Sequence, residues 1–138
     1  VTDLARFISM NLHAGDAAAD DAGIETITGA FDLGTADAGD IFLIVNLTAG
    51  IASSSALETA LEYGGSLQLT ADGAYAVGDR FLVVYDDTVS TYIAQVTNTV
   101  AVPDNGWFGA GSLTAINVVK LTGVADATTV VAAEIDLS

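Results

Sequence analysis

The chain has 138 residues, which suits one domain of ordinary size and is long enough to bury a hydrophobic core. Eighteen acidic residues face three basic ones, so the formal net charge is −15 at pH 7, and nucleic acids or an anionic membrane surface would be repelled. Hydrophobic residues make up 51% of the chain, which predicts a folded protein, and the absence of cysteine excludes disulfides, thiolate metal sites and a cysteine nucleophile.

Two strands are expected in the first half of the chain. Residues 4–12 (LARFISMNL) are ambiguous between helix and strand, and an acidic loop of small residues follows at 14–23. Ile24–Leu33 alternates weakly between apolar and polar residues, which indicates a strand. Ile41–Leu47 (IFLIVNL) is a short apolar run rich in β-forming residues, which is typical of a buried strand and far too short to span a bilayer.

One short helix is predicted at about residues 55–63. The tetrapeptide Ser55–Glu58 has the spacing of a capping box, in which the hydroxyl accepts an unpaired backbone N–H and the glutamate reaches back. Leu57 and Leu61 fall on one helical face, and the pair Gly64–Gly65 is expected to end the helix.

Beyond the helix the hydrophobic pattern changes to a period of two. It predicts two hairpins, formed by Ser66–Thr70 with Ala74–Val77 and by Arg80–Tyr85 with Tyr92–Val96. The first connection contains Asp72 and Gly73, a strong turn signal, and the second is Asp86–Thr91. Further strands are expected at Ile116–Thr122 and Thr129–Leu137. We therefore expect residues 1–138 to form a single, mainly β domain, an antiparallel, β-sandwich-like sheet structure with one short helix.

Four segments of the second half share their order and spacing with a known class of secreted protein. In chain order they are ALETALEYGG (Ala56–Gly65), GDRFLVVYDD (Gly78–Asp87), FGAGSLTAINVVKLTGV (Phe108–Val124) and the tail EIDLS from Glu134. Residues 56–138 thus resemble the C-terminal region of bacterial RTX-type and S-layer proteins exported by type I secretion, while residues 1–55 stay unassigned. The resemblance implies an extracellular, calcium-dependent and self-assembling protein whose C-terminal end carries the export signal.

The chain departs from that class in its calcium motif. The nonapeptide GGxGxDxUx does not occur, and the nearest fragment, Gly64–Ser66, lacks the following Gly and Asp. Fourteen of the 18 acidic residues are Asp, which suits turns and oxygen-ligand loops better than helices. The candidate calcium ligands are Asp16, Asp20, Asp21, Asp32, Asp37, Asp40, Asp86 and Asp87. The alternative for each is a solvated turn residue that caps backbone N–H groups.

Other candidate sites favour binding over catalysis. Trp107 and Phe108 follow a predicted tight turn and are a candidate interface for a partner subunit or a sugar; the alternative is a pair of core side chains at a hairpin end. His13 is the only histidine, which does not support a catalytic triad or a zinc site. Glu58 and Glu62 lie four residues apart and are expected to form a solvated helix face rather than an acid/base pair.

These observations lead us to expect a structural protein that is not an enzyme. It would be an extracellular, self-assembling subunit of a surface layer, filament or matrix, influenced by calcium, with copies of itself as partners. A subunit of charge −15 repels its copies until that charge is screened, and exposed sheet edges would allow strand pairing. Two alternatives stay open: a carbohydrate- or partner-binding module that recognises a cell-surface glycan, and a β-structural protein of a virion or phage tail. Neither nucleic-acid binding nor membrane insertion is expected.

Overall fold

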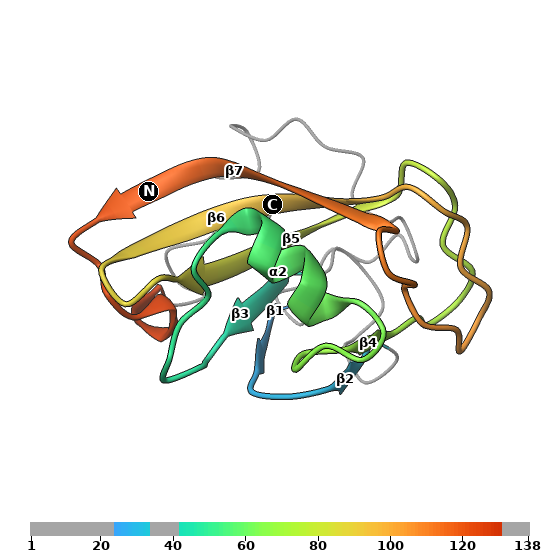
Figure 1. The fold of residues 1–138 in the computed structure, drawn as a ribbon, viewed down its shortest axis with the longest axis horizontal. Helices are drawn as coiled ribbons and strands as arrows, with labels where there is room; N and C mark the ends of the chain where they lie inside the picture. Colours follow the sequence, from blue (N-terminus) through green and yellow to red (C-terminus); the bar gives the residue numbers. More distant parts are fainter. Residues whose placement is uncertain (1–23, 34–41, 131–138) are drawn as a thin grey trace.

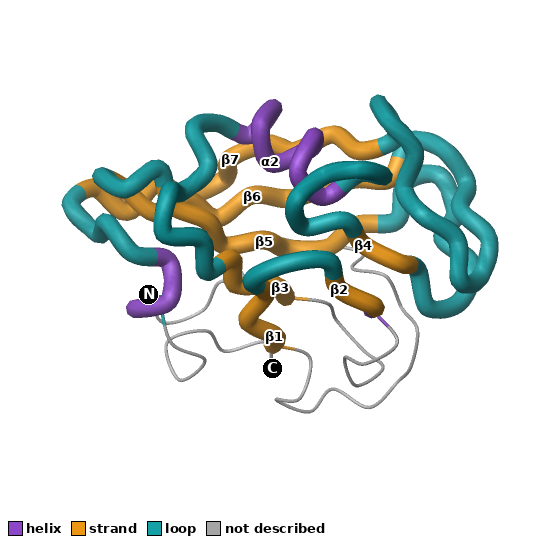
Figure 2. The backbone as a smooth tube through the Cα atoms, turned by 60° about the horizontal axis from the view of Figure 1, so that its bottom comes forward, coloured by secondary structure: helices purple, strands orange, loops and turns teal. Residues whose placement is uncertain are grey.

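The computed structural model describes residues 24–33 and 42–130, and this part of the chain is mainly β with one short helix. Five strands form the larger sheet in the order β1-β3-β5-β6-β7 (Figures 1 and 2). Their bounds are Ile24–Ile27 (β1), Phe42–Val45 (β3), Arg80–Asp86 (β5), Ser90–Asn98 (β6) and Leu113–Thr122 (β7). A small second sheet pairs β2 (Phe31–Asp32) with β4 (Leu69–Thr70). The helices are α2 (Ser54–Leu61) and the 3-10 turn η3 (Ala127–Thr129).

The larger sheet is mixed, so the prediction of an antiparallel, sandwich-like sheet is correct only for half of it. β1, β3 and β5 run parallel, whereas β5, β6 and β7 are joined by antiparallel pairing. Parallel neighbours need a long crossover connection, and residues 46–79, which contain α2, provide it between β3 and β5. The second sheet has only two short parallel strands, and the two sheets do not form a closed sandwich.

The second predicted hairpin is confirmed and the first is wrong. β5 and β6 pair from Arg80 opposite Thr97 to Asp86 opposite Thr91. The segment after α2 does not fold back on itself, because its amides find partners in a distant loop. The N–H of Ala71 donates to the carbonyl of Gly106, and Tyr75 and Val102 exchange backbone hydrogen bonds of 2.8 and 2.9 Å. The first hairpin is thereby replaced by pairing with residues 102–107.

Helix α2 lies close to the predicted range but begins with a different cap. The hydroxyl of Ser53, not that of Ser55, accepts the N–H of Ala56 at 3.1 Å. The predicted core positions Leu57 and Leu61 are fully buried. The helix ends before the glycine pair, as expected, and a Cβ atom on Gly65 would collide with carbonyl oxygens of the helix's last turn.

Both faces of the central strand β5 are buried. On one face, Phe81, Val83 and Tyr85 pack in a large core that also contains the helix residues Leu57 and Leu61. The opposite face carries a smaller cluster made of Ile44, Leu82, Val84, Ile93, Ala127 and Val130. Burial on both faces explains why β5 has an unbroken apolar run in place of strict alternation.

The remaining strand predictions have mixed outcomes. The predicted strand Ile24–Leu33 is divided into β1 and β2, and the apolar run Ile41–Leu47 contains β3, which is buried as expected. The predicted strand Ile116–Thr122 is confirmed and extends back to Leu113. Thr129 belongs to η3, and residues 131–138 lie outside the described residues, as do residues 4–12.

Candidate functional site

Strand β7 forms one edge of the larger sheet and carries exposed apolar side chains. Ile116 is 59% exposed and Val118 is 38% exposed. Ile93 pairs with Val119 and Ala94 with Asn117, so Val118 is the extra residue of a β-bulge. An edge strand with exposed apolar side chains is a common contact region between chains, although a bulge bends the strand and weakens further strand pairing.

Helix α2 covers the first part of this edge with two carboxylates. Oε1 of Glu62 accepts the N–H of Leu113 at 3.1 Å, and Oε1 of Glu58 accepts that of Ala115 at 2.6 Å. Figure 2 shows α2 beside β7, at the edge of the sheet. Alternate amides of an edge strand point away from the sheet, so the two glutamates take the place of a neighbouring strand.

The prediction that Glu58 and Glu62 form a solvated helix face is therefore wrong. Glu62 is only 7% exposed. Four helical residues span about 6 Å and two strand residues span about 6.8 Å. Two carboxylates four residues apart in the helix therefore match two outward-pointing amides that are two residues apart in the strand. This spacing gives the pair an architectural role as caps of the strand edge.

Two exposed aromatic rings lie side by side at the end of α2. Tyr63 is 60% exposed and Trp107 is 53% exposed, with ring centroids 5.0 Å apart and an interplanar angle of 39°. Their backbones are fixed, because the N–H of Tyr63 donates to the carbonyl of Phe108 at 2.7 Å and Trp107 forms an isolated bridge with Thr70. The two rings thus form a supported aromatic surface.

The predicted interface pair Trp107 and Phe108 is divided between surface and core. Phe108 is fully buried and packs edge-to-face on Tyr75 with ring centroids 5.2 Å apart. Its ring also lies 6.2 Å from that of Phe81 in the main core. Phe108 therefore anchors the loop, and Trp107 is the member of the pair that faces solvent.

Asp86 and Asp87 organise the turn between β5 and β6. Oδ1 of Asp87 accepts the N–H groups of Val89 at 3.0 Å and Ser90 at 2.7 Å, while Oδ2 accepts the hydroxyl of Tyr92 at 2.9 Å. The Ser90 N–H, followed by the Tyr92 hydroxyl, holds the pKa of Asp87 below its usual value. These bonds give Asp87 the capping role that Asp commonly has in turns.

Asp86 is buried and joins the same turn to η3. Oδ1 of Asp86 accepts the N–H of Thr88 at 2.9 Å, and Oδ2 accepts that of Ala127 at 3.0 Å. Oδ1 of Asp126 in turn accepts the N–H and the hydroxyl of Thr128, and these bonds lower the pKa of Asp126. Two carboxylates are thus held near each other at the end of β5.

A cavity of about 290 Å³ opens beside these two carboxylates. Its lining consists of Asn46, Leu47, Thr48, Asp86, Thr88, Ala125 and Asp126. The side chains offer carboxylate, amide and hydroxyl oxygens, the donor types that calcium prefers. Calcium takes six to eight oxygens, so backbone carbonyls and water would have to complete the set.

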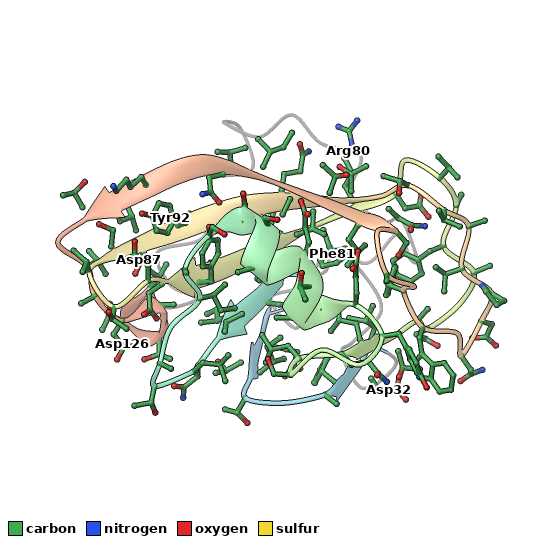
Figure 3. The ribbon with its side chains drawn as sticks, viewed as in Figure 1. Asp32, Arg80, Phe81, Asp87, Tyr92 and Asp126 are labelled. Carbon is green, nitrogen blue, oxygen red and sulfur yellow. The ribbon has the colours of Figure 1, made fainter. Side chains whose placement is uncertain are left out.

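Of the predicted calcium ligands, Asp32, Asp86 and Asp87 lie in the described residues. Figure 3 shows Asp32 well away from Asp87 and Asp126, which lie together at the left of the view. The predicted ligands Asp16, Asp20, Asp21, Asp37 and Asp40 lie outside the described residues, as does His13. Within residues 24–33 and 42–130, no group of three or more His, Cys, Asp or Glu side chains is arranged to hold a metal ion.

No protein-family model, curated protein or solved structure matches the chain. In the part of the chain that the structure describes, no helix is long and apolar enough to cross a membrane.

Sequence reasoning missed two residues of these surfaces. Tyr63 is exposed and lies two residues beyond the buried Leu61, next to the glycine pair that follows the helix. Asp126 is followed two residues later by Thr128, a pattern typical of a side chain that caps a helical turn. Both signals are present in the sequence but are local and weak.

Proposed function

We propose that this protein is a structural subunit, not an enzyme, whose copies associate through the low-charge surface formed by β6, β7 and their connection. The observation that carries the proposal is the distribution of acid along the chain. Between Thr88 and Ala125 the sequence contains one acidic residue, Asp104, so the other 17 of the 18 acidic residues lie outside this stretch. The same stretch contains Lys120, one of only three basic residues.

Exposed apolar side chains gather in that stretch. Seven large hydrophobic side chains of the described residues are exposed, and five of them belong to it: Val89, Val100, Trp107, Ile116 and Val118. Copies that each carry a charge of −15 repel one another over most of their surface. Exposed apolar side chains from this acid-poor stretch are where such copies can approach at the lowest electrostatic cost, and the two carboxylates that lie against the first part of β7, those of Glu58 and Glu62, are already hydrogen-bonded to the strand.

We place the contact on the side chains of Ile116 and Val118 rather than in an extended backbone ladder. Three features of β7 oppose edge-to-edge pairing: the cover by α2, the bulge at Val118 and the presence of Lys120. Lys120 lies with its Nζ 5.5 Å from the centroid of the Tyr92 ring, so part of its charge is directed onto the protein's own surface.

The proposed setting is extracellular, in a surface layer, filament or matrix, and assembly is promoted by calcium. The resemblance of residues 56–138 to type I-secreted surface proteins supports this setting. Calcium would neutralise carboxylates on the acidic remainder of the surface and so reduce the repulsion between copies. The cavity beside Asp86 and Asp126 offers oxygen ligands for such an ion.

The test is light scattering of the full chain, first in excess EDTA and then with millimolar calcium. Particles are expected to grow with calcium and to shrink with EDTA. The variant Ile116→Asp should prevent this growth, whereas the matched control Val77→Asp, which adds the same charge at another exposed position, should assemble like the native chain.

Either of two results would contradict the proposal. One is a monomer in EDTA, in calcium and in high salt. The other is assembly of Ile116→Asp and Val77→Asp to the same size, since the low-charge surface would then be irrelevant to the contact. Large particles that persist in EDTA would retain the assembly proposal and remove calcium from it.

A further inference from the structure

Tyr63 and Trp107 differ from the other exposed apolar side chains in that their two aromatic rings are in contact with each other. Single exposed apolar residues are normal on protein surfaces, but here two rings lie together with more than half of each side chain exposed. The loop behind Trp107 is anchored by buried Phe108, and its turn closes with a 2.9 Å hydrogen bond from Gly106 N–H to the Pro103 carbonyl. The backbone that carries Trp107 is therefore held in place before a ligand binds, which lowers the ordering cost of binding.

Two polar side chains with remaining hydrogen-bonding capacity are bonded to or lie in the backbone segments next to the pair. Oε1 of Gln68 accepts the N–H of Gly64, the residue after Tyr63, which orients the side-chain amide and leaves its NH₂ group as a donor. Asp104, in the turn that precedes Trp107, uses Oδ1 to accept the N–H of Gly73, and its carboxylate keeps further acceptor sites. An aromatic surface whose neighbours in the chain carry an oriented amide and an oriented carboxylate suits a ligand with apolar faces and hydroxyl groups.

We propose that Tyr63 and Trp107 form a binding site for a neutral polysaccharide, with one sugar ring stacked on the aromatic surface and its hydroxyls bonded to Gln68 and Asp104. The axial C–H groups of a pyranose provide the apolar face, and its hydroxyls both donate and accept hydrogen bonds. An anionic polymer is disfavoured by the net charge of −15. Two rings alone cover far less than the roughly 800 Å² that each partner of a stable protein interface buries, whereas a single sugar ring can stack on them without further surface.

Trp107 belongs to the same low-charge stretch as Ile116 and Val118, but the proposed subunit contact rests on those two side chains and not on the aromatic pair, and the sequence provides a direct reporter for the pair. Trp107 is the only tryptophan, so intrinsic tryptophan fluorescence of the full chain arises at the site alone. The experiment titrates the protein with hydroxyethyl cellulose, galactomannan and dextran, with alginate as an anionic control and choline chloride as a cationic one. Emission, quenching by acrylamide and mobility in native gels containing each polymer are measured.

At least one neutral polysaccharide should shift the Trp107 emission to shorter wavelength, protect it from acrylamide and retard the protein in the gel. Trp107→Ala and Tyr63→Ala should each weaken gel retardation at least tenfold, while Trp107→Phe, which keeps a ring, should weaken it less. Because both side chains are mostly exposed, their thermal midpoints should stay close to that of the native chain. Ile116→Asp, which targets only the proposed subunit contact, should bind the polysaccharide normally.

Three results would overturn the site. The first is the absence of any emission or mobility change with all neutral polymers, and the second is retardation that survives both alanine variants. The third is an emission change that follows protein concentration or choline but no polysaccharide, which would assign the rings to a subunit contact or to a cation.

Discussion

Replacing Glu62 by alanine should destabilise the protein by more than the loss of one surface carboxylate. The variant removes the acceptor of the Leu113 N–H, a donor that lies in a buried position. Hydrogen bonds to charged groups contribute about 1.5–3 kcal/mol, and an unsatisfied buried donor costs about 1–3 kcal/mol. We therefore expect the free energy of unfolding to fall by about 2–3 kcal/mol. Glu62→Gln keeps an acceptor oxygen and should lose about half as much or less.

Urea denaturation at pH 7 measures this difference, because midpoint and slope separate a loss of stability from a change in the unfolded state. Asp72→Ala is the matched control: it removes one negative charge at an exposed position and should change the free energy of unfolding by less than about 0.5 kcal/mol. If Glu62→Ala is as stable as Asp72→Ala, the carboxylate does not hold the edge of β7 and the proposed role of α2 fails. The Glu62→Ala variant should also assemble at a lower protein concentration than the native chain, because the edge of β7 is less well covered in this variant.

Three further variants test other parts of the structure. Gly65→Ala should lower the free energy of unfolding by about 3 kcal/mol, because its Cβ would meet backbone oxygens of α2. Gly109→Ala is the control: no atom lies within 4 Å of its Cβ, so this variant should be close to neutral in the same denaturation assay. The pKa of Asp87 is lowered in the folded state, so its carboxylate adds stability above about pH 4, and this stability is lost as the pH falls through the folded pKa. Asp87→Asn should therefore reduce the loss of stability at acidic pH, measured by denaturation at several pH values. An unchanged loss would contradict this role. Burial raises the pKa of Tyr75 well above its usual value, so stability should fall as pH rises beyond about 10, by up to about 1.4 kcal/mol per pH unit. Tyr75→Phe should reduce that slope, measured by denaturation at several alkaline pH values, and an equal slope would show that other groups cause it.

Local parts of the fold were predictable and long-range parts were not. The hairpin of β5 and β6 could be predicted because its strands are contiguous and its turn contains Asp, which caps turn amides. The parallel pairing of β1, β3 and β5 could not, because a strand's apolar pattern records which faces are buried and not the direction of its neighbours. The hairpin expected at Asp72-Gly73 failed for a related reason, since loop 102–107, about 30 residues away, supplied the hydrogen-bond partners.

The roles of individual side chains depended on the same long-range contacts. Glu58 and Glu62 have the spacing of an ordinary solvated face, and only the docking of α2 on β7 turns them into caps for amides 57 and 51 residues away. Trp107 and Phe108 are adjacent aromatic residues, and the sequence does not distinguish the exposed ring from the buried one. Their separation follows from the bridge of Trp107 to Thr70, which directs the next side chain into the core.

The distribution of charge also constrains how calcium can act on assembly. If calcium only neutralises the acidic surface, sodium chloride at matched ionic strength should produce particles of similar size, because screening weakens repulsion between exposed charges without a specific site. If calcium is bound between Asp86, Asp126 and backbone oxygens, it should act at concentrations where sodium has no effect, and Asp126→Asn should raise the calcium concentration required. Asp126 is the better residue to change, because Asp86 is buried and accepts two backbone N–H groups, so that its loss would disturb the turn itself. A calcium response that is selective over sodium and unaffected by Asp126→Asn would exclude this cavity and assign the ion to another part of the acidic surface.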